Sequence, residues 1–573
     1  MMRRFRKIIT MAAAGILAAS ILGGCAGEEK LQITGNTYPY LLQTEKDGEV
    51  IESEATLYFI GGGDIPYVRL SEYMPMLSDI YRGVKMGDIG FEVKKDSYHY
   101  VVTRDDNGSE MYVNPDDDSI MFLDMDSFTM AHGDPVLVTV SQLPDVADQA
   151  GLFRNSEMSF NRHGTQVMFR LADYNIDLVE ADGECYVPLQ TMTDIFVNWT
   201  YIYMVFNGQK LIGSIYGGDL IDQVYDAPTG EMSQAFALFN YNELRFLLDS
   251  FYGLKEEHGI SDFGDFLTYQ TGLYLADTDP KQVDDAINTL CGQYFDDLHS
   301  NFIKPSWMSG KMADDDIQAY RMTKLGPSSI SYLMGSNWTY SMTRGMYYPE
   351  DPPGYEEVGD TAFITFDKFT ADRQDYRKEG TPDDPQDTVE LIMHAHQMIS
   401  RENSPVRNVV LDLTMNTGGN ADAATFVLAW CLGNSNIALR NTLTGAESIM
   451  SLRADVNLDG EYDMYDRIPE DIRIWCLTSP VSFSCGNLVP AVLKNSDRAI
   501  LLGQHTSGGS CVVLPCSTAS GTLFTISGNR QISVVKNGSF YNVDEGVEPH
   551  YILSKPESIY DRQGLVRYMQ ELK

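Results

Sequence analysis

Two serines and a cysteine lie together in the stretch SFSCGNL at residues 482–488. The apolar run IWCLTSPV (474–481) precedes this stretch, and the helix-forming run LVPAVLK (488–494) follows it. A serine on a sharp strand-to-helix turn exposes its hydroxyl, and the backbone N–H of the next residue then points to where an oxyanion forms. The spacing therefore predicts that one of these side chains is a nucleophile in acyl transfer.

A second turn of unusual composition is LDLTMNTGGNADAA, residues 411–424. An apolar strand runs into Asn416-Thr417-Gly418-Gly419 and then into a helix, which places free backbone N–H groups where negative charge is stabilised. Two glycines after a strand, taken alone, often form only a tight turn. Both turns, however, follow predicted parallel strands, and sites form where the carboxyl ends of such strands meet.

The elements that must position these turns are short strands and helices, which alternate from residue 358 to the end of the chain. This order predicts an α/β core with largely parallel strands over 358–573. Ahead of it, residues 231–302 carry apolar residues at helical spacing and predict a helical segment. Residues 303–357 are irregular in pattern and shorter than a domain of about 100 residues, so we interpret them as a connector.

The N-terminal region, residues 37–218, alternates aromatic and β-branched residues with polar ones, which predicts a β-rich α+β fold. Two of its stretches, 64–86 and 183–205, share one order: a turn, Tyr-Val-x-Leu, a short amphipathic helix and a strand. This order resembles the strand-and-helix module of copper-amine-oxidase-like N-terminal domains. The resemblance implies two modules, at residues 37–135 and 136–218.

Five ordered motifs within residues 231–573 resemble those of the C-terminal processing (tail-specific) serine peptidases. That family shows a strand ending in Asp-Leu-Arg-x-Asn-x-Gly-Gly, a serine turn, Arg-Ala, Gly-Glu-x-Thr-x-Gly and Gly-Val-x-Pro-Asp. The matching segments here are 412–419, 482–485, 498–499, 503–509 and 546–550. The resemblance implies a crotonase/ClpP-like spiral core at 358–573, a helical N-terminal cap at 231–302, and hydrolysis of peptide bonds.

Within that resemblance, the spacing to Arg498 places the nucleophile at Ser484. The N–H of Cys485 is then one oxyanion donor, and Gly418 or Gly419 supplies the other. Cys485 has an alternative interpretation, because a thiol at a helix N-terminus can itself attack carbonyls. Its position directly after the matched serine favours the oxyanion role.

The expected base differs from that of the best-known members of the family. Those members use a lysine 25 residues after the serine and a glutamate three residues after it, but Gly509 and Asn487 stand there in this chain. The tricorn and retinoid-binding-protein-like branch uses a histidine, and FDDLHSNF (295–302) resembles its motif, which implies His299 as the base, with His505 as the alternative. An imidazole titrates near pH 6.5 and accepts protons at neutral pH. Candidates for the group that orients this imidazole are Glu545, Asp544, Asp297 and Ser300.

The stretch DVNLDGEYDMYD, residues 455–466, resembles a dockerin-type calcium loop. Oxygen-bearing side chains fall at ligating positions of such loops, and Gly460 stands where the sharp turn is needed. The flanking residues do not form paired helices, so an acidic surface hairpin is the alternative. The candidate ligands of a structural calcium ion are Asp455, Asn457, Asp459, Glu461, Asp463 and Asp466. Catalysis itself is expected to need no cofactor.

Residues 1–24 show a basic head, an apolar run and then small residues, the order of a secretory signal peptide. The LGGC stretch that ends at Cys25 resembles the bacterial lipoprotein box, which implies lipidation of Cys25 and a tether over 25–36. The formal net charge of −39 argues against nucleic acid and anionic lipid as partners, because like charges repel. A lipid on Cys25 is therefore expected to hold the protein at the membrane.

These features predict an extracytoplasmic, membrane-anchored serine endopeptidase of the bacterial cell envelope that cleaves polypeptide substrates. The alternative is a catalytically inactive homologue that binds envelope proteins or peptides. The missing lysine and glutamate favour the alternative, whereas the serine turn, the Asn-x-Gly-Gly stretch and the histidine motif favour the enzyme.

Overall fold

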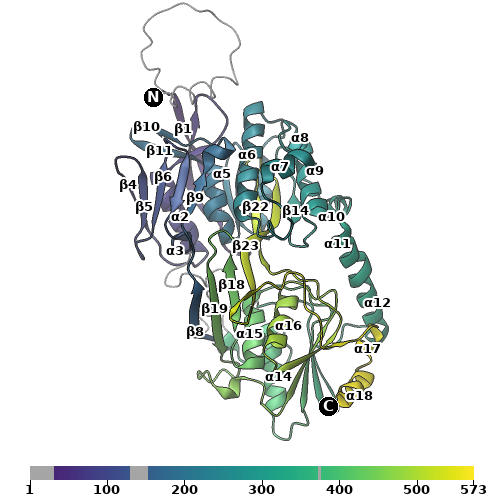
Figure 1. The fold of residues 1–573 in the computed structure, drawn as a ribbon. Coiled ribbons are helices and arrows are strands. Elements are labelled where there is room, and N and C mark those ends of the chain that lie inside the picture. The colour runs from purple at the N-terminus through teal and green to yellow at the C-terminus, as the bar shows by residue number, and fades with distance from the viewer. Residues whose placement is uncertain (1–30, 130–151, 271, 372–375, 573) are drawn as a thin grey trace, which may run out of the picture.

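The computed structural model describes residues 31–129, 152–270, 272–371 and 376–572. They form two lobes, an upper one that holds the N-terminal sheets and helices and a lower one that holds the C-terminal α/β sheet (Figure 1). Within these ranges no helix has the length and apolar character to span a lipid bilayer. The predicted signal peptide and Cys25 lie outside the described residues.

The N-terminal region contains two sheets, and each takes strands from both predicted modules. The seven-stranded sheet has the order β10-β11-β3-β2-β1-β13-β12 and the five-stranded sheet β4-β5-β6-β7-β9. The bounds are β1 Ile33–Gln43, β2 Ile51–Ile60, β3 Tyr67–Arg69, β4 Phe91–Lys95, β5 Tyr100–Arg104, β6 Glu110–Asn114, β7 Ser119–Phe122, β9 Val167–Arg170, β10 Val179–Ala181, β11 Glu184–Pro188, β12 Ile202–Phe206 and β13 Leu211–Ile215. The expected boundary near residue 135 therefore does not separate two sheets.

The two similar stretches recognised in the sequence interlock. Strand β3 pairs antiparallel with β11, so that Val68 lies opposite Val187 and Arg69 opposite Tyr186. Helix α2 (Leu70–Gly83) follows β3, and the shorter α5 (Leu189–Met192) follows β11. Each repeat thus covers the strand edge that the other would leave exposed, which is the physical reason why the repeats form one unit and not two.

The predicted helical segment is present as α6 (Gln234–Phe251), α7 (Phe263–Gln270), α8 (Gly272–Leu275) and α9 (Pro280–Thr289). Ser233 caps α6 by accepting the Phe236 N–H at 3.0 Å, and Asp279 caps α9 ahead of Pro280. These helices do not form a core of their own. Their apolar faces share one buried cluster with the N-terminal sheets, for example through the Phe169 and Phe246 rings, whose centroids are 5.3 Å apart.

A third sheet runs from one lobe into the other, with the order β14-β23-β18-β19-β8 and with β22 and β24 also paired to β23 (Figure 1). Its bounds are β8 Phe153–Arg162, β14 Asn301–Lys304, β18 Ile437–Asn441, β19 Glu447–Ala454, β22 Cys511–Ser517, β23 Leu523–Lys536 and β24 Ser539–Tyr541. The long strand β23 contributes to the upper core through Phe524 and Ile526 and to the lower core through Ile532 and Val534.

The connector is helical, although its sequence pattern looked irregular. It contains α10 (Asp314–Met322), α11 (Pro327–Ile330), a π-helical turn at Ser331–Asn337 and α12 (Trp338–Tyr347). No proline interrupts the chain between 328 and 348, so the helix continues despite Gly335 and Gly345. The run lies along one side of the molecule and joins the two lobes (Figure 1).

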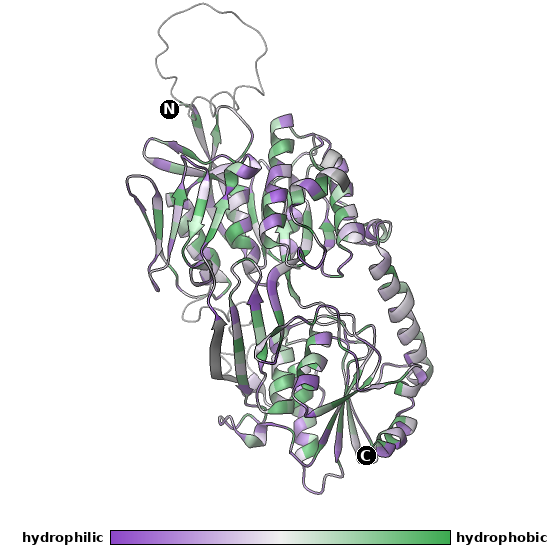
Figure 2. Cartoon of the chain, viewed as in Figure 1, coloured by the Kyte–Doolittle hydropathy of each residue, from purple (hydrophilic) through white to green (hydrophobic). Residues whose placement is uncertain are grey.

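The lower lobe is a three-layer α/β structure, as expected from the alternating elements. Its sheet has the order β15-β16-β17-β20-β21-β25, and all neighbours except β15 and β16 are parallel. Apolar residues lie along the strands and on the helix faces that pack against the sheet (Figure 2). One face packs against α14, α15 and α16, and the other packs against α12, α17 and α18. The bounds are β15 Tyr355–Val358, β16 Thr361–Thr365, β17 Asn408–Asp412, β20 Arg473–Thr478, β21 Ala499–Gly503, β25 Tyr551–Ile552, α14 Thr388–Ser400, α15 Ala421–Leu432, α16 Cys485–Asn495, α17 Glu557–Tyr560 and α18 Arg562–Glu571.

Candidate active site

Ser484 lies on a strained turn between β20 and α16. Its φ of 56° and ψ of −122° fall in a region that side-chain-bearing residues rarely adopt. The turn holds this conformation partly because the Ser484 N–H donates to the Gly508 carbonyl at 2.8 Å. Ser484 occupies the N-cap position of α16, yet its side chain makes no capping hydrogen bond. The hydroxyl therefore lies at the positive end of the helix dipole and is not used as a capping acceptor for the N–H groups of that helix.

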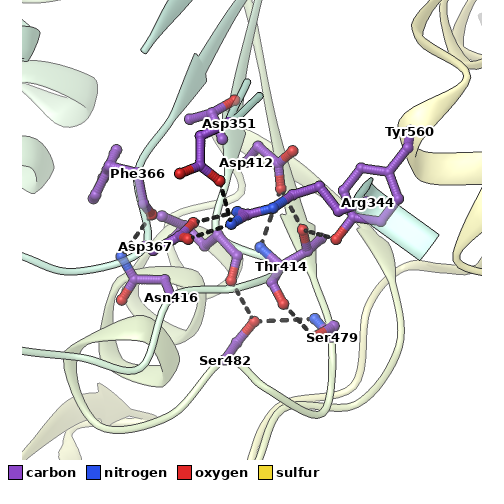
Figure 3. A network of polar contacts seen from close by, with 12 residues as sticks. Arg344, Asp351, Phe366, Asp367, Asp412, Thr414, Asn416, Ser479, Ser482 and Tyr560 are labelled. Atoms are coloured by element: carbon purple, nitrogen blue, oxygen red, sulfur yellow. Dashed lines mark hydrogen bonds and ion pairs between the residues drawn. The ribbon is translucent and has the colours of Figure 1, made fainter. Parts of the chain in front are cut away.

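The other two candidates on this turn have structural roles. Ser482 is fully buried, and its hydroxyl donates to the Leu413 carbonyl at 2.7 Å and accepts the Ser479 N–H at 3.0 Å (Figure 3). Burial raises the pKa of the Cys485 thiol to about 12, and this thiol donates to the Gly419 carbonyl at 3.4 Å. A thiol with such a pKa stays protonated at neutral pH, so the turn leaves Ser484 as its nucleophile candidate.

The glycine loop lies directly against the serine. A Cβ added to Gly418 would stand 2.6 Å from Ser484 Cβ and 3.1 Å from its Oγ, and the φ of Gly418 is +99°. The N–H of Gly418 already donates to Asn416 Oδ1 at 2.9 Å. By contrast, the N–H groups of Gly419 and Cys485 find no acceptor among the described residues. Of the two glycines left open by the sequence, Gly419 is thus the one with an available donor.

The glycine loop is fastened to the loop that follows β16. Asn416 Nδ2 donates to the Phe366 carbonyl at 3.0 Å, and the Thr417 N–H donates to the Asp367 carbonyl at 3.0 Å. Arg344 of the connector helix α12 donates two hydrogen bonds of 2.7 Å each to the Asp367 carboxylate (Figure 3). Sequence analysis missed Arg344, because nothing in its local pattern reveals that the connector reaches the site.

The same close-up shows a second support below the strand ends. Thr414 donates to Asp412 Oδ1 at 2.6 Å and lies 3.2 Å from the Tyr560 hydroxyl (Figure 3). Asp412 also forms a buried ion pair with Arg562 of α18. A buried carboxylate needs such a partner, since an unpaired charge in the interior is strongly destabilising. The C-terminal helix therefore helps to hold the strand that delivers the glycine loop.

A cavity of about 1240 Å³ opens over Ser484, between the lobes. The lower lobe lines it with Ser484, Phe483 and the Gly419 loop, and the connector lines it with Tyr332 and neighbouring residues. The Tyr332 hydroxyl donates to the Val481 carbonyl at 2.9 Å, which ties the connector to the serine turn. A chain segment that enters between the lobes can therefore reach Ser484.

His299 lines the same cavity as Ser484, although 185 positions separate them in the sequence. Its ring packs 4.6 Å from the Phe483 ring, centroid to centroid, and is 7% exposed. Its Nδ1 has no hydrogen-bond partner among the described residues, and no hydrogen bond joins the ring to Ser484. Burial lowers the pKa of His299 to about 4, so that the imidazole is neutral at pH 7.

None of the predicted orienting groups contacts the His299 ring. Asp544 accepts the Ser510 N–H at 2.8 Å and the Ser510 hydroxyl at 3.1 Å, and Glu545 next to it is exposed. Asp297 caps the backbone through the N–H groups of His299 and Ser300. The Ser300 hydroxyl donates to Asp297 at 2.8 Å, as does the Tyr252 hydroxyl. Asp544 and Asp297 are committed to turns and Glu545 makes no hydrogen bond to the ring, so the expectation that one of these groups orients the base does not hold here.

Two departures from the family pattern have a structural account. At Gly509, where the best-known members of the family have a lysine base, φ is +87° and an added Cβ would lie 2.5 Å from the Phe483 ring. Asn487 is buried and donates to the Val543 carbonyl at 2.9 Å, and its Oδ1 accepts the Thr506 hydroxyl at 2.6 Å. The Phe483 ring therefore fills the space that a lysine would need. His505, the alternative histidine, is exposed and does not line the cavity.

The candidate calcium ligands of the segment 455–466 make hydrogen bonds within their own loop. The side chains of Asp455 and Asp466 accept hydrogen bonds from backbone N–H groups of their own loop, and Arg377 pairs with Asp455. Asn457, Asp459 and Asp463 likewise cap neighbouring N–H groups. In the ranges that the structure describes, no three His, Cys, Asp or Glu side chains converge as metal ligands. The segment is an acidic loop that follows β19 and ends in a 3₁₀ turn at Met464–Asp466, without the paired strands of a hairpin.

Comparison with known proteins gives partial similarities. A Chlamydia trachomatis (serovar D) protein, described only as "Protein", is 29% identical over 110 residues, which are 19% of this chain and 18% of that protein. The chain thus matches less than a fifth of that relative's length. The Photosystem II D1 C-terminal processing protease is 18% identical over 36% of this chain and 46% of its own, with a TM-score of 0.27. A putative peptidase from Parabacteroides merdae is 13% identical over 60% of this chain and 97% of its own, with a TM-score of 0.41.

The family comparison is more specific. Residues 360–553 match Peptidase family S41. This segment contains the parallel strands, the Gly418-Gly419 loop and the Ser484 turn, which are the parts that carried the resemblance in the sequence. The predicted family is thereby confirmed at the level of this domain: residues 360–553 are a domain of Peptidase family S41.

Proposed function

We propose that the chain is a serine endopeptidase in which Ser484 is the nucleophile and His299 the base. The observation that carries this proposal is the strained backbone of Ser484, with φ 56° and ψ −122°, at the start of α16 and in a cavity that His299 also lines. Strain of this kind persists where the surrounding structure enforces it, typically at catalytic sites.

In the proposed reaction, Ser484 Oγ attacks the carbonyl carbon of the peptide bond while His299 takes the hydroxyl proton. The N–H groups of Cys485 and Gly419 donate to the developing oxyanion, which also gains from the positive end of the α16 dipole. His299 then protonates the leaving amine, and water hydrolyses the acyl-enzyme. The neutral imidazole suits the first step because it can accept a proton at pH 7.

For His299 to take the proton of Ser484, the imidazole and the serine hydroxyl must come within hydrogen-bond distance of each other. Catalytic hydrogen bonds are often long without substrate and tighten in the complex. A polypeptide between the lobes would contact the walls formed by Tyr332 and Phe483, and the Phe483 ring packs on His299. We therefore propose that the hydrogen bond between Ser484 and His299 forms when substrate binds. The pair then acts as a dyad, without a carboxylate as third member.

The finer features of the fold and location also belong to this proposal. The parallel sheet with α14 to α16 is the crotonase/ClpP-like spiral core, and residues 231–302 are its helical cap. The protein is lipid-anchored at Cys25 on the outer side of the cytoplasmic membrane, and its substrates are polypeptides of the envelope. The LGGC box and the preceding apolar run support this placement.

The second candidate is a catalytically inactive homologue that binds polypeptides in the same cavity. One specific observation favours it: His299 Nδ1 has no partner among the described residues, so nothing there orients the ring or raises its basicity. Both candidates use the interlobe cavity, but only the peptidase forms a covalent serine adduct.

Labelling with a fluorophosphonate probe separates these candidates. The peptidase predicts stoichiometric labelling that Ser484→Ala abolishes and His299→Ala strongly slows. Ser482→Ala is the matched control, because it removes a hydroxyl two residues away that only supports the turn, and it should retain labelling. No labelling of a folded wild-type protein, or labelling that survives Ser484→Ala, would refute the assignment.

A further inference from the structure

The interlobe cavity is basic although the protein is strongly acidic. The chain carries 81 acidic and 42 basic side chains. Among the residues that line the cavity this balance is reversed, with two acidic residues, Glu45 and Asp47, against the basic residues Lys46, Lys85, Arg321, Lys368 and Arg530. Such a local field attracts anionic groups into a cleft that the rest of the surface would repel.

Arg530 is the most unusual of these basic side chains. It lies on β23, where the strand turns hydrophilic between the two lobes (Figure 2), and it is only 7% exposed. Its guanidinium stacks 4.0 Å above the Trp199 ring, which also lines the cavity. Its side chain forms no hydrogen bond with the described residues, and the carboxylate that interacts with it electrostatically is that of Asp126, whose oxygens accept hydrogen bonds from Asn441 and Thr444.

The other buried arginines of the described chain have carboxylate partners, which makes the contrast informative. Arg562 pairs with Asp412, and Arg104 pairs with Asp106 at 2.6 Å. Within the cavity, Lys85 pairs with Glu45 at 2.9 Å and Arg321 donates to Asn301. Burial lowers the pKa of Arg530 to about 10, and the guanidinium therefore remains charged at pH 7. Asp126 offsets part of this charge, but it directs its oxygens at Asn441 and Thr444, so the N–H groups of the guanidinium are left to bind an anion that enters the cavity.

We propose that Arg530 binds a carboxylate of the polypeptide that enters the cavity, and that this contact makes the protein selective for segments that carry acidic side chains. The inference rests on the proposed function, because it names the substrate class of the same cleft. The stacked Trp199 ring holds the guanidinium plane in place, and its fork of N–H groups matches a carboxylate.

The test measures binding without turnover, in the full chain carrying Ser484→Ala. Four fluorescein-labelled peptides of one length and sequence differ only in an internal Glu or Gln and in a C-terminal acid or amide. Fluorescence anisotropy should show about tenfold tighter binding for the Glu peptides than for the Gln peptides, with either terminus, and a preference set by the terminus alone would overturn the proposal. Equal affinities for all four peptides would overturn the proposal.

Variants then assign the preference to one residue. Arg530→Met, which keeps apolar bulk on Trp199, should abolish the preference, and Arg530→Lys should retain part of it. Arg473→Gln is the matched control, because Arg473 is an exposed arginine of β20 outside the cavity. A preference that persists in folded Arg530→Met would also overturn the proposal. If Arg530→Met does not fold, the proposal is tested by comparing the peptide affinities of the protein with Arg530 and of Arg530→Lys, in which the preference should be smaller.

The outcomes for the two proposals are separable. Carboxylate-dependent binding in a protein that the fluorophosphonate probe never labels would refute the peptidase and leave the carboxylate site standing. Probe labelling at Ser484 together with peptide binding that does not depend on a carboxylate would refute the carboxylate site and leave the peptidase standing.

Discussion

The Phe483 ring occupies the space above Gly509, so that a Cβ on Gly509 would lie 2.5 Å from Phe483 Cε2. The same ring packs on the other side against His299, 4.6 Å away between centroids. One aromatic side chain thus fills the position of a lysine base and supports the histidine that is proposed to replace it. The absence of a lysine at position 509 and the presence of a histidine at position 299 are therefore linked through Phe483.

The first prediction concerns the steric exclusion of a lysine side chain at position 509 by the Phe483 ring. In a His299→Ala background, Gly509→Lys should fail to restore probe labelling, because the Phe483 ring and the φ of +87° prevent a lysine from reaching Ser484. The melting temperature should also fall. Gly538→Lys is the control, since Gly538 has a similar φ of +79° but open space around it, and it should cost only about 1 kcal/mol of stability from backbone strain. Restored labelling would show that a Ser/Lys pair is sterically accessible.

The second prediction concerns the contact between the glycine loop and the nucleophile. Gly418→Ala would push a methyl group to 2.6 Å from Ser484 Cβ, so it should displace the serine or the loop and reduce labelling by at least about 100-fold, the scale of a lost oxyanion donor. Gly445→Ala shares the positive φ, at +74°, but its nearest neighbour would be 3.8 Å away, and it should leave labelling intact. Equal effects of both variants on the labelling rate would contradict the proposed packing.

The third prediction is the pH dependence of activity. Because burial lowers the pKa of His299 to about 4, the base stays unprotonated well below the usual titration range of histidine. On the acid side, kcat/KM should therefore fall with a midpoint near pH 4 and not near 6.5. A pH series of kcat/KM with a peptide substrate gives this midpoint. A midpoint at 6 to 7 would mean that the ring is solvated or paired with a carboxylate in the active protein.

The same shift predicts an effect on stability with a definite sign. The pKa of His299 is lower in the folded than in the unfolded protein, so between pH 6.5 and about 4 the unfolded chain binds more protons and stability falls as the pH falls. A shift of this size corresponds to about 3 kcal/mol. Urea unfolding at pH 7 and pH 4.5 should show a smaller loss in His299→Gln than in the wild type. His396, whose pKa burial also lowers to about 4, continues to contribute in both proteins.

Local sequence was sufficient for the serine turn and for the family, because both depend on short motifs between Asp412 and Pro549. It was insufficient where partners come from distant segments. Arg344 reaches Asp367, Arg530 reaches Trp199, and the two Tyr-Val repeats pair with each other, none of which a periodicity reveals. The orienting group for His299 was assigned from the motif alone, and the fold turned those carboxylates toward backbone N–H groups instead.

The fourth prediction concerns the acidic loop at residues 455–466. Arg377 and the loop N–H groups already satisfy Asp455, so calcium should have no vacant ligand set there. Adding EDTA or millimolar calcium should therefore shift the melting temperature by less than about 2 °C, whereas a folding-linked metal would shift it with its concentration. Asp455→Asn should destabilise the protein equally with and without calcium. A calcium-dependent rise in melting temperature that Asp455→Asn removes would restore the calcium assignment.

The last prediction treats Arg344 as a positioning residue. Its two bonds to Asp367 secure the loop whose carbonyl accepts the Thr417 N–H, and Gly418 and Gly419 follow directly. Arg344→Gln should slow labelling at Ser484 about tenfold, less than the loss of an oxyanion donor, because the loop is loosened and not removed. Since Asp367 is half exposed, the coupling free energy in a double-mutant cycle with Asp367→Asn should be only about 1 kcal/mol. Arg82→Gln, which breaks a surface pair with Asp79, is the control and should change neither rate nor coupling. If Arg344→Gln lowers the melting temperature but leaves the labelling rate unchanged, Arg344 supports the fold alone and does not position the glycine loop.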